Sequence, residues 1–237
     1  MKFKSADERY LAERRKLSEQ LGPRELWSVI DHWPLYCGIG NLGRFLAISD
    51  LLRETLPVPG HIAEFGSWRG ANLMLMAKLL RILDPHGSKR TFCFDSFAGL
   101  ETFAPQDGQA ARASSGQYRG AYDELRKLIS LYELDDDIVI HVGDVATTLP
   151  AALEDESLSF SFVYCDLDLY SPTKLVLDCI HPRLSKGGLI ILDEWNHQKW
   201  PGESIAVREF LAAHPEAYRM RHVRAAAQPT LALERLL

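Results

Sequence analysis

Hydrophobic and polar positions alternate along this chain in a rhythm that predicts strands followed by helices. Short runs of consecutive apolar residues, bounded by glycine or acidic residues, indicate strands that are buried on both faces. Longer segments with apolar positions three and four apart indicate amphipathic helices between those strands. The predicted strands cover residues 61–65, 91–94, 138–142, 160–165 and 189–192. This order predicts a Rossmann-like, doubly wound α/β fold with a mostly parallel sheet.

Helices are predicted between these strands, together with signals that start and stop them. Asn41 is expected to cap the helix that follows it, and Lys186–Gly188 to end the helix that begins at Pro172. A polar stretch over 99–116 breaks the pattern, and it is either a mobile loop over a site or an ordinary surface insertion. The predicted helices cover 42–55, the segment ending near 83, 118–132, 147–153, 172–184 and 203–213.

The two ends of the chain add elements outside this rhythm. Residues 218–224 and 230–235, joined by AAAQP, predict a closing hairpin, so the sheet should have seven strands with one antiparallel edge strand. Residues 1–40 are expected to form a helical extension, because the segment 6–20 is highly charged with few apolar positions. We expect this extension to be a lid or an oligomer contact, and 41–237 to be the main domain of a homo-oligomer.

Composition excludes several classes of function. The net charge of −5 and the absence of a long basic cluster argue against nucleic acid as a partner. No stretch has the length of a membrane span, and residues 1–10 lack the apolar core of a signal peptide, so no membrane partner is expected. The four cysteines have no CxxC spacing, which favours a reduced, cytoplasmic location.

Acidic residues follow two of the predicted strands. Asp166 and Asp168 come directly after the strand 160–165, and Asp193 and Glu194 come after the strand 189–192. Because the carboxyl ends of parallel strands line one crevice, these groups should lie together and repel one another unless a cation is bound. Oxygen ligands of this kind suit a divalent cation. Either pair alone would be better explained as solvated strand ends or helix caps, but the two pairs together, with a glycine-rich turn upstream, favour a cation site.

The turn after the first strand, Glu64–Gly70, is the predicted place for a cofactor. Its small residues allow the backbone to approach a ligand, and the next helix offers free N–H groups. The spacing does not match GxGxxG, and the bulky Trp68 would obstruct a pyrophosphate, whereas S-adenosylmethionine carries only a carboxylate and an ammonium group. Glu64 could accept a bond from that ammonium, and Asp95 could accept both ribose hydroxyls.

Smaller predictions concern single polar residues. Asp144 is either an adenine contact or the cap of the next helix, and Ser96 either supports the ribose contact or makes a turn. His197 is a candidate second base, although it could be an ordinary loop histidine. The residues predicted to bind the cofactor are Glu64, Gly66, Ser67, Gly70, Asp95, Ser96, Asp144 and Asp166.

Several motifs together resemble the macrocin O-methyltransferase (TylF-like) family. They are AEFGSWRG, FCFDSFAGL, YCDLDLYSPT, GGLIILDEW and PGESIAVREF, within residues 41–214. The resemblance implies an S-adenosylmethionine-dependent, Mg²⁺-dependent O-methyltransferase that acts on sugar hydroxyls. It also implies that Asp166 and Asp193 bind the metal and that Asp168 is the general base. Position 194 is commonly Asp in that family, and Glu194 would ligate through a longer side chain.

These observations predict metal-assisted methyl transfer from S-adenosylmethionine to a hydroxyl of a deoxysugar or a sugar-bearing natural product. The predicted metal ligands are Asp166, Asp193 and Glu194, and the predicted catalytic residues are Asp168 and His197. Two alternatives remain at this stage. The same carboxyl groups could serve a methyltransferase for a catechol-like diol, or the chain could bind the cofactor without turnover.

Overall fold

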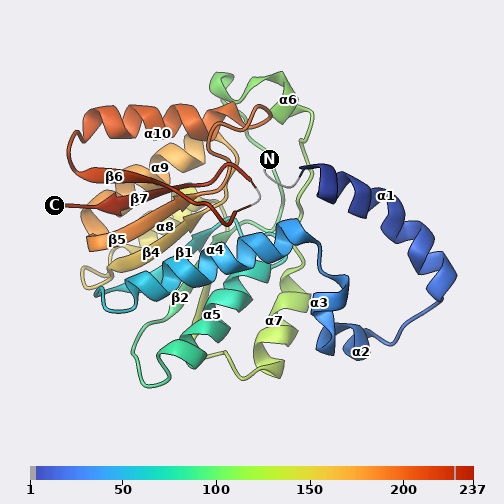
Figure 1. Ribbon diagram of the computed structural model, residues 1–237. Coiled ribbons are helices and arrows are strands. Elements are labelled where there is room, and N and C mark those ends of the chain that lie inside the picture. The colour runs from blue at the N-terminus through green and yellow to red at the C-terminus, as the bar shows by residue number, and fades with distance from the viewer. Residues whose placement is uncertain (1–3, 227) are drawn as a thin grey trace.

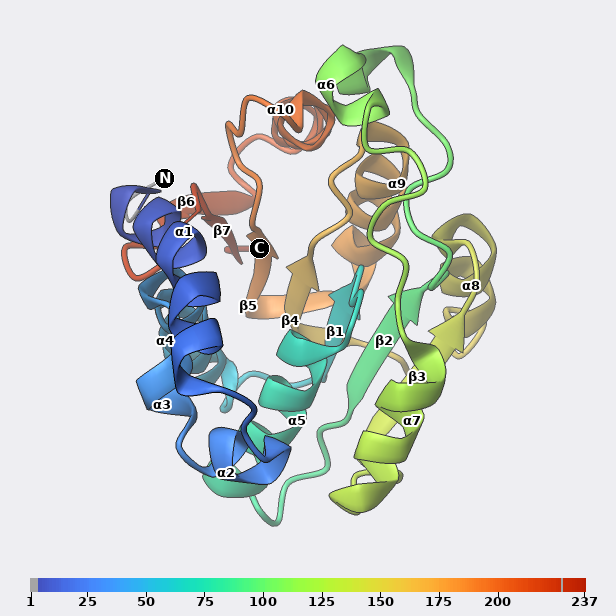
Figure 2. The ribbon, with the colours of Figure 1, turned by 90° about the vertical axis from the view of Figure 1, so that its right-hand side faces the viewer.

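A seven-stranded sheet forms the centre of the protein, whose computed structural model describes residues 4–226 and 228–237. The strand order is β3-β2-β1-β4-β5-β7-β6 (Figures 1 and 2). Strands β1 to β5 are mutually parallel, whereas β7 runs antiparallel to both β5 and β6. The predicted Rossmann-like fold is therefore confirmed, and within the closing hairpin β7 is the antiparallel strand, with β6 outside it. The strands are β1 (His61–Phe65), β2 (Thr91–Asp95), β3 (Ile138–Val142), β4 (Phe160–Cys165), β5 (Leu184–Leu192), β6 (Tyr218–His222) and β7 (Leu231–Arg235).

Helices cover both faces of the sheet, as a doubly wound fold requires. Helices α8, α9 and α10 pack on one face, and α4, α5 and α7 pack on the other (Figure 2). The main helices are α4 (Ile39–Thr55), α5 (Ala71–Leu83), α7 (Tyr122–Leu131), α8 (Val145–Ala152), α9 (Tyr170–Ile180) and α10 (Pro201–Ala213). A short 3₁₀ turn (Pro105–Asp107) and α6 (Gly108–Arg112) lie within the predicted loop 99–116.

The central strands are buried on both faces, which explains their continuous apolar sequence. Neighbouring residues of β4 point to opposite faces, so Phe162 joins the core under α4 and α5 while Val163 joins the core under α9 and α10. Both side chains are fully buried. A shift by one residue would exchange the side chains of the two closely packed cores, so the positions of the carboxyl ends are firmly set.

Two predicted boundaries are wrong, and each has a local cause. Asn41 does not cap α4, because the helix already begins at Ile39 with Gly38 as its N-cap. Lys186–Gly188 do not end a helix but lie inside β5. Helix α9 ends at Ile180. The 3₁₀ turn His181–Arg183 follows directly and contains Pro182, which has no N–H group to donate to a helix hydrogen bond. Strand pairing of Leu184 with Phe160 then begins before the two glycines.

The segment 99–116 is tied down by a buried acidic residue. One carboxylate oxygen of Asp107 accepts a hydrogen bond from the backbone N–H of Tyr170 at 2.7 Å. The other oxygen accepts one from the N–H of Ala104, also at 2.7 Å. The segment is therefore anchored at the start of α9, and its two ends are joined by backbone hydrogen bonds of Leu100 with Gly116 and Gln117.

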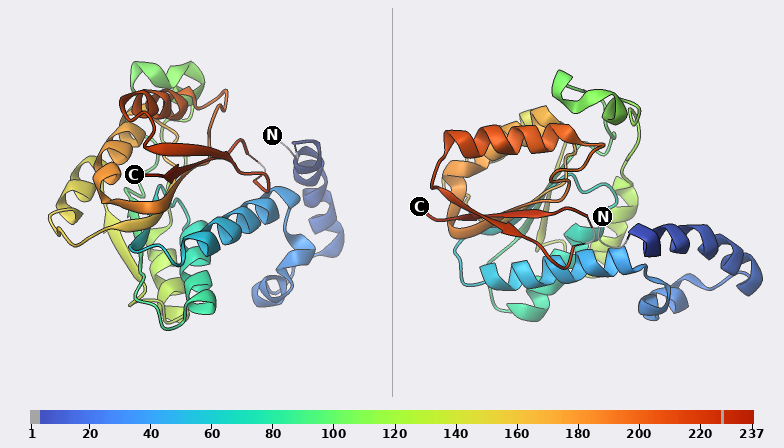
Figure 3. Two further views of the ribbon diagram at one scale, coloured as in Figure 1. Left: turned by 60° about the vertical axis from the view of Figure 1, so that its left-hand side comes forward. Right: turned by 45° about the horizontal axis from the view of Figure 1, so that its top comes forward.

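The N-terminal residues form a separate helical arm. Helices α1 (Lys4–Leu21), α2 (Leu26–Asp31) and α3 (Trp33–Tyr36) project beyond the start of α4 (Figures 1 and 3). Several large apolar side chains of this arm are exposed, among them Leu26, Trp33 and Leu35. Within residues 4–226 and 228–237, no helix has both the length and the apolar character needed to cross a membrane.

Candidate active site

A cavity of about 590 Å³ opens at the carboxyl ends of the parallel strands. Each of these strands contributes one residue or turn to its lining. Gly66 follows β1, Asp95 ends β2, Asp144 follows β3, Asp166 follows β4 and Asp193 follows β5. This edge is where open α/β sheets bind their ligands. The predicted crevice is thus present, and its lining includes eight of the residues that the sequence singles out, namely Gly66, Asp95, Ser96, Asp144, Asp166, Asp168, Asp193 and Glu194.

The turn after β1 is shaped by Gly66 and Asp95. Gly66 has a φ of 82°, and a Cβ atom there would lie 1.9 Å from the carbonyl oxygen of Asp166, so no larger residue fits. The Oδ2 atom of Asp95 accepts hydrogen bonds from the N–H groups of Ser67 and Trp68, both at 2.7 Å. Its Oδ1 atom accepts one from Phe97 at 2.6 Å. Asp95 therefore holds the turn in place while facing the cavity.

Glu64 lies beneath this turn rather than in the cavity lining. Ser67 Oγ donates a hydrogen bond to Glu64 Oε2, whereas Glu64 Oε1 is buried without a partner. Burial raises the pKa of Glu64 to about 8, and the nearby Asp166 adds to the shift. Gly70, the N-cap of α5, packs on Leu125. Direct contact of Glu64, Ser67 and Gly70 with a cofactor remains a prediction.

Ser96 and Asp144 each have the structural role that the sequence offered as one of two possibilities. Asp144 caps α8, since its Oδ1 atom accepts a hydrogen bond from the N–H of Ala146 at 2.9 Å. Ser96 makes a turn through a 3.2 Å bond from the N–H of Ala98 to its Oγ. Both residues also line the cavity. A structural role and a ligand contact are therefore compatible at these positions.

The far end of the cavity is acidic. We use the term acidic cluster for the carboxyl groups of Asp166, Asp168, Asp193, Glu194 and Glu203. Burial raises the pKa of every one of them, to about 6 for Asp166 and to about 8 for Glu194. Repulsion between neighbouring carboxylates adds to the shift for Asp168, Asp193 and Glu203. Without a cation, burial and mutual repulsion therefore disfavour full ionisation of the cluster.

Unpaired oxygen atoms mark the acidic cluster as a place that lacks a partner. Asp193 Oδ1, Glu194 Oε2 and Glu203 Oε2 are all buried without a hydrogen bond. Buried polar atoms of native proteins are otherwise nearly always paired. Asp168 adds backbone strain, because its φ of 61° lies in the left-handed region that a non-glycine residue rarely adopts. Orphaned oxygens and local strain are features of a ligand site.

Glu203 is a member of the cluster that the sequence analysis missed. It lies in the first turn of α10, is fully buried, and its Oε1 atom accepts a hydrogen bond from the N–H of Glu194 at 3.1 Å. An acidic residue in a first helical turn is usually explained by the helix dipole. The sequence therefore gave no reason to single it out.

Two further residues complete the wall of the cavity and were also missed. Arg44 of α4 donates a hydrogen bond of 3.0 Å to Gln228 Oε1, although the two are 184 positions apart. Gln228 Nε2 in turn donates to Glu194 Oε1. Both residues line the cavity. No motif in the sequence connects them.

His197 lies behind Glu194, outside the cavity lining. Its Nδ1 atom is 3.5 Å from Glu194 Oε2 and accepts a hydrogen bond from the N–H of Lys199 at 3.2 Å. Burial lowers the pKa of His197, and the charge of Lys199 lowers it further. Asp168, by contrast, lines the cavity. Asp168 is therefore in a position to contact a molecule in the cavity, whereas His197 lies outside the lining.

The acidic cluster fits a divalent cation by its chemistry, although no closed cage is present. Within residues 4–226 and 228–237, no three Asp, Glu, His or Cys side chains converge on one point suited to a metal. Mg²⁺ usually keeps several waters and is held by one or two carboxylates together with oxygens of the substrate. An open set of this kind suits Mg²⁺ better than a metal that needs a complete protein cage.

The fold and the cavity together define a doubly wound α/β protein with a cofactor-binding edge facing a carboxylate cluster. The family model for macrocin-O-methyltransferase (TylF) matches residues 38–227, so the chain belongs to this family. The expected resemblance is thereby confirmed.

The curated relatives match little more than half of this chain, whereas the solved structures of CalS11 match nearly all of it. An 8-demethyl-8-(2,3-dimethoxy-alpha-L-rhamnosyl)-tetracenomycin-C 4'-O-methyltransferase of Streptomyces olivaceus is 30% identical over 146 residues, covering 58% of this chain and 54% of the relative. The chain spans about half the length of the curated relatives it matches. The crystal structure of CalS11, a calicheamicin methyltransferase, is 30% identical with a TM-score of 0.82 and covers 94% of this chain and 90% of that one. An apo structure of CalS11, described as a TDP-rhamnose 3'-O-methyltransferase, covers 94% and 92% with 30% identity and a TM-score of 0.74.

The raised pKa values predict how stability depends on pH without metal. Glu64 and Glu194 have a folded-state pKa of about 8, against ordinary values of 4.5. A folded-state pKa above the unfolded one means that stability is lost as pH rises through the folded value. In EDTA, we expect the melting temperature to fall as pH rises from 7 to 8.5. Thermal unfolding scans at several pH values check this. A melting temperature that stays level or rises between pH 7 and 8.5 would contradict the raised pKa values of Glu64 and Glu194.

Proposed function

We propose that this protein transfers a methyl group from S-adenosylmethionine to a sugar hydroxyl, with Mg²⁺ bound at the acidic cluster. The observation that carries the proposal is the single cavity that joins the Asp95 turn to the acidic cluster. The names of the family and of its relatives support it, because those relatives are O-methyltransferases and two of the names include rhamnose. A hydroxyl of a deoxysugar, free or attached to a natural product, is the acceptor that fits best.

Cofactor binding is assigned to the residues near β1 to β3. Asp95 would accept a ribose hydroxyl at Oδ1, which accepts only one backbone bond, whereas Oδ2 already accepts two. Gly66 would let the backbone approach the cofactor, and Asp144 would face the adenine. Asp166, the member of the acidic cluster whose backbone lies against Gly66, would be near the methionine part. The methyl group would then point toward the acidic cluster.

Activation of the acceptor is assigned to the acidic cluster. A bound Mg²⁺ would lower the pKa of a sugar hydroxyl and orient a vicinal diol. Asp166 and Asp193 would hold it, and the free Oε2 atom of Glu194 would join them. Asp168, facing the cavity, would accept the hydroxyl proton. His197 would take this role only if its ring turned past Glu194.

Methyl transfer from a sulfonium to an oxyanion removes charge, so positioning and exclusion of water matter more than acid catalysis. The buried lining of the acidic cluster suits that requirement, since Asp193 and Glu194 are 2% and 5% exposed. The cavity is also large enough to hold a cofactor and a sugar side by side, given that small-molecule sites usually span about 300–1,000 Å³.

The test is a methyl-transfer assay with purified protein, S-adenosylmethionine and Mg²⁺. We expect methylation of a nucleoside-diphosphate rhamnose or a rhamnosylated natural product, loss of activity in EDTA, and recovery when Mg²⁺ is added back. Asp168→Asn should lower turnover with the metal still bound, and Asp136→Asn, at an exposed position, is the matched control. Preference for a catechol would favour the diol alternative. Tight cofactor binding without transfer to any acceptor would leave only the non-catalytic module.

The N-terminal arm, residues 1–40, is proposed to be an oligomer contact or a lid over the cavity. Its exposed side chains Leu26, Trp33 and Leu35 support this assignment, because large apolar groups gathered on one surface favour a partner. A second copy of the chain is the proposed partner. Analytical ultracentrifugation of the full chain and of a Leu35→Glu variant tests the contact. If both sediment as monomers, the arm is not an oligomer contact.

A further inference from the structure

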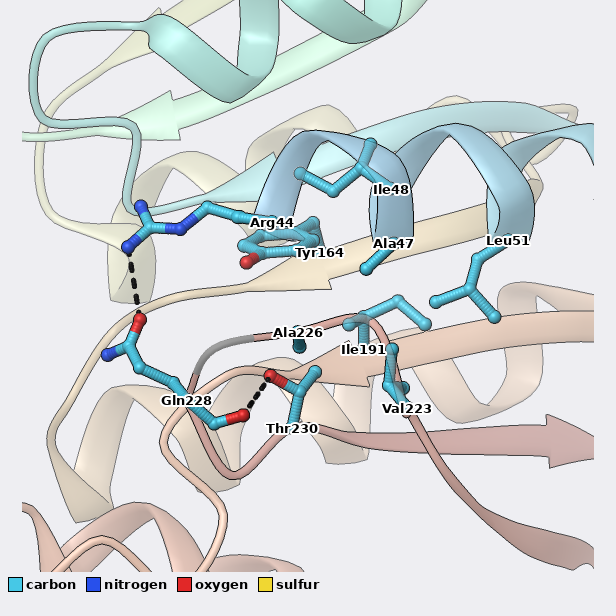
Figure 4. Close-up of a pocket in the computed structure, with 10 residues that line it drawn as sticks. All are labelled: Arg44, Ala47, Ile48, Leu51, Tyr164, Ile191, Val223, Ala226, Gln228 and Thr230. Carbon is cyan, nitrogen blue, oxygen red and sulfur yellow. Dashed lines mark hydrogen bonds between the residues drawn. The ribbon is translucent and has the colours of Figure 1, made fainter. Parts of the chain in front are cut away.

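Gln228 lies between the acidic cluster and Arg44. Within the part of the chain that the structure describes, Arg44 is the only cationic side chain of α4 that lines the cavity. Its amide oxygen accepts a hydrogen bond of 3.0 Å from Arg44 Nη2, drawn in Figure 4. Its amide nitrogen donates to Glu194 Oε1. The two bonds use both ends of the amide and join α4 to the turn after β5.

Arg44 fixes which way the amide faces. A guanidinium group has donors only, so it bonds the oxygen of Gln228 and leaves the nitrogen for Glu194. The reverse orientation would place the amide oxygen against a carboxylate and the amide nitrogen against a guanidinium, so both contacts would repel. Charge assistance at both ends also makes these bonds stronger than neutral ones.

Gln228 determines which oxygen of Glu194 stays free. Glu194 Oε1 is occupied by the Gln228 amide, whereas Oε2 is buried and has no hydrogen bond. Glutamate has one more rotatable bond than aspartate, so its carboxylate needs an additional contact to hold one orientation. The hydrogen bond from Gln228 to Oε1 supplies that restraint. It leaves Oε2 as the oxygen that is available to a cation.

The backbone that carries Gln228 is itself packed firmly against α4. Val223 and Ala226 are buried against Ala47, Ile48 and Leu51, and the space left between them is about 10 Å³ (Figure 4). That space is no larger than one water molecule needs, so no ligand occupies this contact. Thr230 Oγ1 also donates a hydrogen bond of 3.3 Å to the carbonyl oxygen of Gln228. The amide is therefore presented from a fixed support.

We propose that Gln228 and Arg44 are a positioning pair that orients Glu194 for the cation. This inference rests on the proposed function, because it concerns the same acidic cluster. Neither residue contacts the reacting atoms in this role. Both act through the carboxylate of Glu194.

The test measures Mn²⁺ binding to the full chain with S-adenosylhomocysteine present, by calorimetry or by electron paramagnetic resonance. Gln228→Met keeps the length of the side chain but loses both bonds, and we expect the Mn²⁺ Kd to rise about tenfold or more. Activity should recover at saturating Mn²⁺, so that the change lies in the metal requirement and not in kcat. Gln228→Asn, whose amide is too short to reach both partners, should shift Kd in the same direction. Gln117→Met, at an exposed position, is the matched control.

A double-mutant cycle isolates the part played by Arg44. Arg44→Met removes a positive charge near the cation as well as the amide contact, so the effect of that variant alone mixes two causes. In its background, Gln228→Met should raise Kd only about threefold or less, because the amide is no longer oriented. Arg53→Met, on the exposed side of α4, is the control for this arm.

The outcomes separate this inference from the proposed function. A Kd for Gln228→Met and Gln228→Asn equal to that of the unchanged protein would overturn the role of Gln228. The same rise in Kd with and without Arg44 would overturn the pairing. Failure of the unchanged protein to bind Mn²⁺ would instead overturn the metal assignment in the proposed function, and with it this inference.

Discussion

Replacing Asp193 by asparagine is expected to lower methyl transfer about 1,000-fold or more while leaving cofactor affinity nearly unchanged. Loss of a metal contact removes several kcal/mol of stabilisation from the transition state, and about 1.4 kcal/mol corresponds to a factor of ten in rate. Cofactor affinity should survive because Asp95, the proposed ribose contact, is on another strand. Initial rates and a cofactor titration on the same preparation check both parts.

The same variant should gain stability when no metal is present. Asp193 is 2% exposed, and its pKa is raised well above the ordinary range by burial and by the neighbouring carboxylates. A neutral amide of the same shape removes that repulsion, so the melting temperature in EDTA should rise. Asp136→Asn, at an exposed position, should leave rate and melting temperature unchanged. Full activity in Asp193→Asn would exclude Asp193 from the metal site.

Replacing Asp95 by alanine is expected to weaken S-adenosylmethionine binding about 100-fold or more. A hydrogen bond from a ribose hydroxyl to a carboxylate is worth about 1.5–3 kcal/mol. The change also removes the acceptor for three backbone N–H groups, those of Ser67, Trp68 and Phe97. Calorimetric titration of the cofactor, with a melting curve of the free protein, measures both effects.

Asp95→Asn separates the two roles of this side chain. The amide keeps one acceptor oxygen and the shape of the side chain, so the turn should be less disturbed than in Asp95→Ala. Ribose binding should still weaken, because an NH2 group, which only donates, replaces the second carboxylate oxygen. Asp136→Ala is the control for a change of charge alone. An unchanged Kd in both Asp95 variants would remove Asp95 from the cofactor site.

The sequence predicted most of the sheet and the strand-end acids because both depend on local patterns. Buried runs such as 160–165 identify parallel strands, and their carboxyl ends must meet at one edge. Asp166 and Asp193 could therefore be placed in a common crevice before any coordinates were known. Gly66 was predictable for a similar reason, since a tight turn after a strand needs a residue without a side chain.

The residues that the sequence missed act through tertiary contacts. Gln228 belongs to a loop without a motif, and its partners Arg44 and Glu194 are distant in the chain. Glu203 has the position of an ordinary first-turn acid, and only the packed structure reveals that it is buried under Glu194. Lys186–Gly188 have the composition of a helix stop, but pairing of β5 with β4 overrides that local preference.

The most direct test is an anomalous difference map from crystals grown with S-adenosylhomocysteine and Mn²⁺. We predict a single Mn²⁺ peak within about 2.0–2.5 Å of carboxylate oxygens of Asp166 and Asp193, with the cofactor sulfur facing it across the same cavity. A cofactor bound elsewhere, or Asp166 and Asp193 turned apart with no peak between them, would contradict the account.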